Sequence, residues 1–458
     1  MMRCPAKILA LGAVLACGSS WSRAQAGSLE AQIDAYVEPY VRSGNFSGTV
    51  RVERKGHVTF SKSYGFADRE HRLRNNQATG FHVASLSMQF TAAAVLRLVD
   101  AGLLRLDDSA AEFAPGIQGG EKITIRDLLV ERSGLPDIND LPEYETLLEE
   151  HQTAESLVAK IQGRPLLFAP GTEFLHEEHS AYNLLALIVE RKTGKPFADA
   201  IEELVFRPAG LTHSGVDDDR GRAADLAKGY APKGTYGLRQ AKAIHWSGKT
   251  GNGSAYTTAS DEALWVRKLF RSELLSKASR ELVLDTSARV GYGWFRERSE
   301  RFGQTEYSMN GRAPGFAALV VYLPNDETTV VVLSNIYSSA ATIMGHDIAA
   351  ISLGRPYQKV RFADNGLLAK ELKACTGAFR FGTDFYLPNA QVTLTAEGKE
   401  LFLRWPSGDL SALIPVEKDK FVDRSYWMEV RIERDGTGKP VGLTYGRFRG
   451  EPQGAGGL

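Results

Sequence analysis

A serine and a cluster of titratable side chains are the residues of this sequence best suited to chemistry. Ser85 stands at the head of a long apolar stretch, and His176, Glu177, Glu178 and His179 follow one another further along. A serine hydroxyl attacks a carbonyl carbon only when a base takes its proton and hydrogen-bond donors stabilise the oxyanion. Either histidine could be that base, with a neighbouring glutamate to orient the imidazole ring. Their residue types make Ser85, His176, Glu178 and His179 candidate catalytic residues.

The same cluster has two other interpretations. A polar loop of this kind can lie in solvent and contribute nothing beyond solubility. His176 and His179 could also bind one metal ion together, but no further ligand is evident in the sequence. We therefore expect no metal site.

Hydrophobic periodicity predicts the elements that must position these residues. Apolar residues from Phe90 to Val99 occur nearly all round a helix, which indicates a central buried helix that stops at Gly102. Alternation over 48–66, around Lys55-Gly56, is typical of a β-hairpin. The other elements expected in this part are a helix over 183–193, strands over 291–294, 316–323 and 329–335, and a helix over 340–353.

Short motifs in a fixed order resemble those of the serine beta-lactamase and penicillin-binding-protein family. The resemblance covers residues 48–353 and rests on Ser85 with Phe90, Ser133-Gly134-Leu135-Pro136, Pro170-Gly171, Tyr292-Gly293-Trp294, Pro314-Gly315-Phe316 and Leu333-Ser334-Asn335. It implies an α+β fold in which an antiparallel sheet is flanked by helices. It also implies acyl transfer by the serine without a cofactor, although a fold alone does not fix a function.

The sequence departs from the family pattern at all three catalytic motifs. The lysine that normally follows the serine by three residues and helps to remove its proton is Met88 here. The tyrosine and asparagine of the second motif are absent from the loop that holds Glu177, and the cation of the third motif is replaced by Met309, before Asn310 and Gly311. The resemblance implies that these five residues contact the substrate. Without the third-motif cation, a penicillin carboxylate should bind poorly.

A literal lysine-threonine-glycine sequence occurs elsewhere, at Lys249-Thr250-Gly251. It runs directly into Asn252-Gly253-Ser254, where the family has a glycine-rich loop, so the three-letter match is weak evidence for the third motif. Lys249 could still reach the pocket from that loop and replace the lost charge.

The pattern of apolar and polar residues changes after residue 355. Residues 27–355 form the predicted hydrolase-like domain, and residues 356–371 indicate a linker. Residues 372–458 alternate apolar and polar side chains in short runs separated by turns such as Ser407-Gly408 and Asp435-Gly436. This pattern predicts a small antiparallel β-barrel, similar to the lipocalin-like domain that often follows this hydrolase domain. We expect it to be a structural appendage without a site of its own.

The N-terminal residues 1–26 predict an export signal, since Arg3 and Lys7 precede an apolar stretch that leads to Ala24-Gln25-Ala26. An alternative is a lipoprotein signal with Cys17 as the lipidated residue. Both interpretations place the mature chain in the periplasm or outside the cell. Lys+Arg and Asp+Glu are equal at 55 each, which gives no sign of a nucleic-acid partner, and no apolar run is long enough to span a bilayer.

The leading functional hypothesis is an exported acyl hydrolase or transferase that acts on a small-molecule or peptide ester or amide, with Ser85 as nucleophile. Two alternatives stay open. One is a catalytically inactive homologue that binds a ligand or partner through the inherited cleft. The other is a non-acyl enzyme that transfers protons through residues 176–179.

Overall fold

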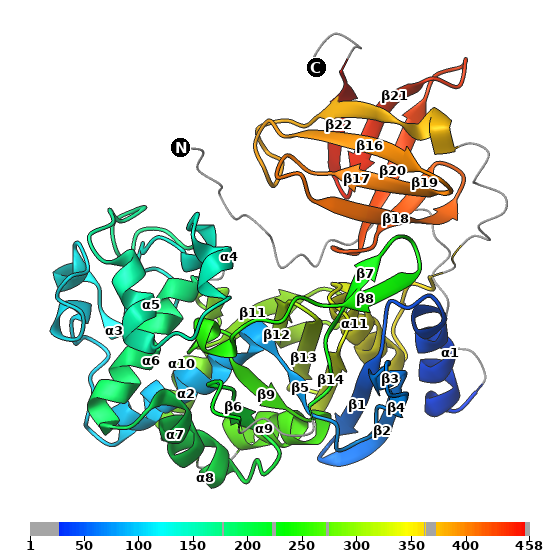
Figure 1. Cartoon of the computed structure of the whole chain (residues 1–458). Helices are drawn as coiled ribbons and strands as arrows, with labels where there is room; N and C mark the ends of the chain where they lie inside the picture. The colour runs from blue at the N-terminus through cyan, green and yellow to red at the C-terminus, as the bar shows by residue number, and fades with distance from the viewer. Residues whose placement is uncertain are drawn as a thin grey trace.

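The structure is a computed structural model that describes residues 27–175, 178–221, 226–271, 274–360, 362 and 372–453. Its larger part is built on a seven-stranded sheet with the strand order β10-β11-β12-β13-β14-β1-β2 (Figure 1). All neighbouring strands in this sheet are antiparallel. The strands are β1 Gly48–Arg54, β2 His57–Tyr64, β10 Val290–Gly291, β11 Trp294–Ser299, β12 Gln304–Ala313, β13 Phe316–Leu323 and β14 Thr328–Ser334.

Helices cover both faces of this sheet, which explains why β13 and β14 are buried at every position. Val330 and Val332 of β14 pack with α1 (Leu29–Arg42) and α11 (Ala340–Ser352) on one face. Val331 and Leu333 pack on the other face, in the cluster formed by α2 (Met88–Asp100), α6 (His179–Thr193) and α9 (Ala259–Arg271). A strand buried on both sides reads as a continuous apolar run.

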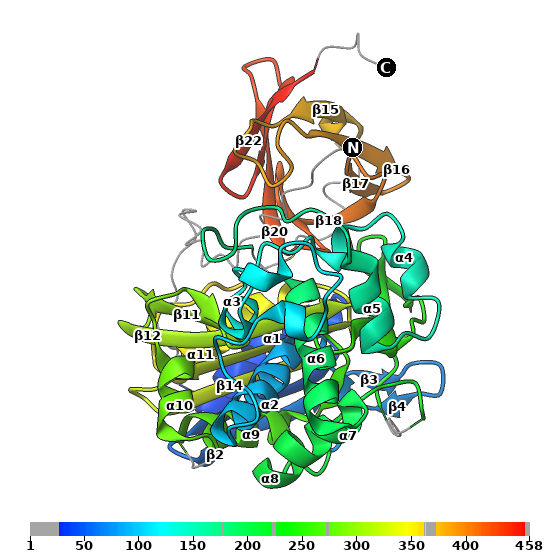
Figure 2. The same cartoon turned by 90° about the vertical axis from the view of Figure 1, so that its left-hand side faces the viewer.

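The predicted central helix is α2, which is buried from Met88 to Leu96 and is followed by Gly102 with a φ of 70°. Figure 2 shows α2 and α6 in front of the sheet, and the two helices pack against each other (Figure 2). The remaining helices of this layer are α3 Ile125–Leu129, α4 Tyr144–Leu147, α5 Ala154–Ile161, α7 Phe197–Ile201, α8 Arg207–Ala209 and α10 Lys277–Leu284.

Short strands outside the main sheet fix the loops around the start of α2. The strand β9 (Ala255–Thr257) pairs with both β5 (Phe81–His82) and β6 (Gly215–Val216). Two further antiparallel pairs stand apart from these sheets. They are β7 (Tyr230–Lys233) with β8 (Gly237–Gln240), and β3 (Phe66–Asp68) with β4 (Leu73–Arg74).

The C-terminal part is a closed barrel of eight antiparallel strands, which confirms the predicted α+β architecture with a small β-barrel. Its interior is aromatic, and the rings of Phe381 and Phe385 stack with their centroids 4.0 Å apart. The strands are β15 Gly377–Arg380, β16 Gln391–Glu397, β17 Glu400–Arg404, β18 Leu410–Glu417, β19 Lys420–Asp423, β20 Met428–Arg434, β21 Pro440–Tyr445 and β22 Phe448–Pro452.

The barrel contacts the larger part through the turn between β19 and β20. The guanidinium of Arg424 is buried and donates hydrogen bonds to the carbonyl oxygens of Gly44, Gly234 and Gly237 and to the side-chain oxygen of Asn45. The ring of Trp427 packs on Tyr40 of α1, with the ring centroids 5.2 Å apart. A buried cation that donates to four oxygens is strongly orienting, so this turn fixes the barrel against the sheet domain.

The predicted export signal and most of the predicted linker, residues 361 and 363–371, lie outside the described residues. Among the described residues, no helix combines the length and the apolarity that crossing a membrane would need.

Candidate active site

Ser85 lies in a tight turn immediately before α2. The turn is a short 3-10 helix, Ala84–Ser87, and Ala84 adopts a φ of 50°, a left-handed conformation that its Cβ disfavours. Two hydrogen bonds to Ala255 of β9 hold it: the Val83 N–H donates to the Ala255 carbonyl at 3.0 Å, and the Ala255 N–H donates to Ser87 Oγ at 2.9 Å. The backbone at Ser85 is therefore fixed by the small β5-β9-β6 sheet as well as by the start of α2.

His179, the first residue of α6, brings an imidazole to this serine. Its Nε2 lies 3.4 Å from Ser85 Oγ, and its Nδ1 lies 3.0 Å from Asp137 Oδ2. The same Asp137 oxygen accepts the backbone N–H of His179 at 3.0 Å. All three residues are buried, with less than a tenth of each exposed. The arrangement is a serine, a histidine and an aspartate in the order that nucleophilic catalysis requires.

The carboxylate determines which nitrogen of the imidazole carries the proton. An ionised Asp137 only accepts hydrogen bonds, so His179 Nδ1 donates to it and Nε2 keeps its lone pair towards the Ser85 hydroxyl. The amide nitrogen of Asn139 lies 3.1 Å from the same Nδ1. Within the turn of residues 137–140, the Asn139 amide is itself a donor and cannot share the Nδ1 proton, so the Asp137 carboxylate is the group that holds the imidazole in the tautomer that can accept a proton from serine.

A further carboxyl group, Asp140, lies at the end of this turn. Although its surface is exposed, partial desolvation of its carboxyl and the negative charge of Asp137 raise its pKa to about 6, and this rise is opposed by the positive charge that His179 can carry. Asp140 therefore titrates near neutral pH, and above its pKa it places a second negative charge near the imidazole.

Glu178 was expected to orient the imidazole, but its carboxylate lies elsewhere. It is fully buried and accepts hydrogen bonds from the backbone N–H and the hydroxyl of Ser133, at 3.2 and 2.6 Å, and from the Leu135 N–H at 3.1 Å. Burial raises the pKa of Glu178 to about 8. It anchors the Ser133–Leu135 segment that leads directly to Asp137. His176 and Glu177, the other predicted members of this cluster, lie outside the described residues.

The residues expected to contact substrate fall into two groups. Met88 and Met309 are almost completely buried in the apolar cluster around α2, so they fill space below the site. Asn310 is partly exposed on β12. A Cβ on Gly311 would lie 3.0 Å from the Ser85 backbone nitrogen and 2.0 Å from the Val83 carbonyl oxygen. Only glycine allows β12 to approach the nucleophile this closely.

The structure thus brings Ser85, His179 and Gly311 together, as the sequence predicts, and adds Asp137, which the sequence analysis missed. Asp137 directly follows the Ser-Gly-Leu-Pro turn, and this position was the available signal. Its contact with His179 spans 42 residues of chain and follows no local pattern, so spacing alone could not reveal it.

Comparisons with known proteins agree with this fold. The family model described as Beta-lactamase matches residues 33–352. A penicillin-binding protein of Bacillus subtilis (strain 168) is 27% identical over 417 residues, which cover 84% of this chain and 90% of that protein. The crystal structure of a penicillin binding protein from Bacillus halodurans aligns with a TM-score of 0.62 at 28% identity, over 70% of this chain and 98% of that one. EstCE1, a hydrolase with promiscuous acyltransferase activity, aligns with a TM-score of 0.61 at 20% identity, over 70% and 98% of the two chains, which shows likeness of fold alone.

Proposed function

This chain belongs to the beta-lactamase family, and we propose that it is an acyl hydrolase or transferase in which Ser85, His179 and Asp137 form the catalytic triad. One observation carries the proposal. The imidazole of His179 lies within 3.4 Å of the serine hydroxyl through one nitrogen and within 3.0 Å of the aspartate through the other. A separation of this size is typical of such sites without substrate and shortens when substrate binds.

The proposed reaction uses these three groups in sequence. Ser85 Oγ attacks the carbonyl carbon of an ester or amide while its proton passes to His179 Nε2. The bond to the leaving alcohol or amine then breaks as Nε2 gives that proton to the leaving group, and the acyl group stays on Ser85 Oγ. Water or another acceptor attacks this acyl-enzyme and gives its proton to Nε2, which returns it to Ser85 as the product leaves.

The negatively charged oxygen of each tetrahedral intermediate needs hydrogen-bond donors. We assign the Ser85 backbone N–H as one of them, because it belongs to the nucleophile and because Gly311 presents no side chain to it where β12 comes close. Preorganised backbone donors of this kind contribute on the order of 10²–10³ to the rate.

The position of the base separates this site from the usual pattern of its family. Met88 stands where a lysine normally assists the serine, and a thioether cannot take a proton. We therefore propose that His179 replaces that lysine in function from a different helix, and that the substrates are esters or amides. Similarity to a penicillin-binding protein supports this coarse class of chemistry.

Covalent labelling tests the proposal directly. The purified chain is incubated with a fluorophosphonate and with p-nitrophenyl esters, and intact mass and turnover are compared with Ser85→Ala. We expect one adduct and measurable turnover in the natural chain, and neither in Ser85→Ala. Absence of an adduct and of turnover, in a protein that is folded, would support an inactive binding homologue. Turnover that survives Ser85→Ala would support proton-transfer chemistry.

We also propose that the chain is exported, since residues 1–26 have the pattern of an export signal. Mass spectrometry of the mature chain from fractionated cells tests this. A chain that begins at Gly27 supports secretion, a lipidated Cys17 supports a lipoprotein, and an intact Met1 in the cytoplasm overturns export.

A further inference from the structure

We propose that Lys249 binds a carboxylate on the acyl substrate, so that the preferred substrates are esters or amides that carry a free acid. This inference rests on the proposed function, because it assigns the substrate class of the same site. It uses a lysine that belongs to none of the three family motifs.

Lys249 is buried, and its one polar partner among the described residues is the neutral Tyr144 hydroxyl. It exposes 7% of its surface, and its ammonium donates a hydrogen bond to the Tyr144 hydroxyl, with the centre of that ring 5.2 Å away. No ion pair joins it to a carboxylate of the described residues, although most buried lysines in proteins have such a partner. An ammonium kept out of water without a counter-ion is unfavourable, and a phenol cannot supply the missing charge. An anionic ligand would supply it.

The carbon chain of Lys249 lies beside the turn that holds the nucleophile. A Cβ on Gly253 would lie 3.2 Å from both Cβ and Cδ of Lys249 and 3.6 Å from the carbonyl carbon of Ala84, which is bonded to Ser85. One glycine therefore separates the lysine from the serine turn. The partner hydroxyl belongs to Tyr144, the first residue of α4, which follows the segment of Asp137 and Asn139. The carbon chain of Lys249 thus lies beside the serine turn, and its ammonium reaches the first residue of the helix that follows the Asp137 segment.

The loop after Lys249 is tied to both helices of the proposed triad. Thr91 of α2 donates its hydroxyl proton to the Gly251 carbonyl at 2.6 Å, and Asn183 of α6 donates to the Thr250 carbonyl at 2.7 Å. The start of α2 follows Ser85, and α6 begins with His179. The position of Lys249 relative to the catalytic groups is therefore set by the helices that position those groups.

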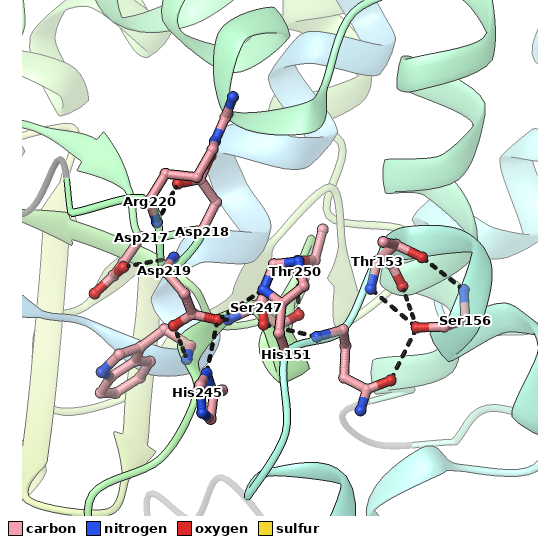
Figure 3. A network of polar contacts seen from close by, with 12 residues as sticks. His151, Thr153, Ser156, Asp217, Asp218, Asp219, Arg220, His245, Ser247 and Thr250 are labelled. Carbon is pink, nitrogen blue, oxygen red and sulfur yellow. Dashed lines mark hydrogen bonds and ion pairs between the residues drawn. The ribbon is translucent and has the colours of Figure 1, made fainter.

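Lys249 is the last residue of a 3-10 turn, Trp246–Lys249, and a polar network fixes the start of this turn (Figure 3). Asp219 accepts the backbone N–H groups of Trp246 and Ser247, at 3.0 and 3.3 Å, and the imidazoles of His151 and His245 lie 3.2 and 3.3 Å from it. The Thr250 hydroxyl closes the turn on the Ser247 carbonyl at 2.7 Å. A long lysine side chain on so constrained a backbone loses less freedom when it binds an anion, which favours a specific contact.

Matched esters test the charge preference. The p-nitrophenyl half-esters of glutaric and adipic acid carry a free carboxylate, and their methyl diesters have the same chain without the charge. The natural chain is expected to prefer the half-esters by tenfold or more in kcat/KM, after subtraction of the uncatalysed rate. Lys249→Met should lose this preference through a higher KM for the half-esters, with the diesters unchanged. Lys249→Arg should retain it.

Lys242→Met is the matched control, because Lys242 is half exposed and already pairs with Glu149 at 2.7 Å. It should keep the full preference for the half-esters. An equal preference in the natural chain and Lys249→Met, or a comparable loss in Lys242→Met, would overturn the proposal. Circular dichroism and the Tm establish that each variant is folded, and Lys249→Gln serves as a second neutral variant.

A binding measurement separates this inference from the proposed function. Calorimetric titration of full-length Ser85→Ala with adipate needs no catalysis. Binding that is present in Ser85→Ala and absent in Ser85→Ala/Lys249→Met supports the carboxylate site even if no ester is turned over. Absence of adipate binding in both, or equal binding in both, overturns it.

Discussion

Two histidine–aspartate pairs lie near Ser85, and only one of them faces its hydroxyl. In the first, His179 Nδ1 lies 3.0 Å from Asp137; in the second, His82 Nε2 lies 2.9 Å from Asp217. The two imidazoles are similarly buried. They differ in what the other nitrogen faces, since His179 Nε2 points to Ser85 Oγ, whereas His82 Nδ1 is buried without a hydrogen-bond partner among the described residues.

The surroundings of His82 make it a structural residue. Its ring stacks on Trp246 with the centroids 3.8 Å apart and packs edge-on against Phe316. Burial lowers its pKa, an effect that Asp217 and Asp219 oppose. Asp217 in turn accepts the backbone N–H of Asp219, the residue that anchors the turn of Lys249. An imidazole paired with an aspartate can therefore act as a base only when its other nitrogen lies within hydrogen-bond reach of a nucleophile.

The largest expected effect is the loss of the paired base. His179→Ala should lower the turnover of p-nitrophenyl esters by about 10⁴, because Ser85 then has no group to take its proton. His82→Phe keeps the stack on Trp246 and should change turnover less than tenfold, while it lowers stability by about 1–3 kcal/mol because Asp217 loses its partner. Steady-state kinetics and urea unfolding of both variants measure this difference. Similar losses of turnover in the two variants would remove the distinction between the pairs.

Substitution of the aspartate should also affect the two pairs differently. Asp137→Asn should lower turnover by about 10³–10⁴, because the amide can donate a proton to His179 Nδ1 and so favour the tautomer that cannot act as base. Asp217→Asn places the same change in the structural pair and should leave kcat within about threefold of the natural value. A large effect of Asp217→Asn on kcat, with the Tm preserved, would show that the second pair takes part in the chemistry.

The nucleophile side of the site gives the third prediction. Gly311→Ala should lower kcat by about 10²–10³, because the new methyl group would crowd the Ser85 N–H, the assigned oxyanion donor. Gly436→Ala is the control, since a Cβ at that position of the barrel meets no atom within 4 Å. Kinetics are compared with the Tm of each variant, because the same methyl group also approaches the Val83 carbonyl. An unchanged kcat in a folded Gly311→Ala would contradict the assigned donor.

The sequence predicts the fold well because its signals are local. The apolar run from Phe90 and the hairpin around Lys55-Gly56 depend on spacing within single elements, and both elements are present. The position of His179 was also accessible, since counting back from Tyr182 along α6 reaches it. An apolar helix and its first turn are determined by residues close together in the chain.

The polar contacts of the site were less predictable because they join distant segments. Asp137 meets His179 across 42 residues, and Glu178, the immediate neighbour of His179, turns instead to Ser133. Whether Asp137 or Glu178 faces the imidazole depends on how the Ser133 turn packs against α6. The network from Asp219 to the turn of Lys249 has the same character, so a charged residue in a glycine-rich loop could not be placed from spacing.

The smallest expected effect concerns the additional carboxylate that lies near each histidine–aspartate pair. Asp140 lies near His179 and has a pKa raised to about 6, whereas Asp219 lies near His82. Above pH 6 the charge on Asp140 stabilises the imidazolium of His179, so Asp140→Asn should move the acidic limb of the kcat/KM profile to lower pH, by about one unit or less. Asp219→Asn should leave that limb in place, because its imidazole takes no proton from Ser85.

The same titration has a signature in stability. The folded-state pKa of Asp140 is above its ordinary value of 3.8, so the unfolded chain loses this proton first as the pH rises. Asp140 therefore destabilises the fold progressively between about pH 4 and pH 6, and Asp140→Asn should remove that part of the decline in urea unfolding measured across the window. If the kinetic limb moves and the stability profile does not, the charge acts on His179 without the partial desolvation inferred for the Asp140 carboxyl. If neither moves, only the primary carboxylate distinguishes the catalytic pair from the structural one.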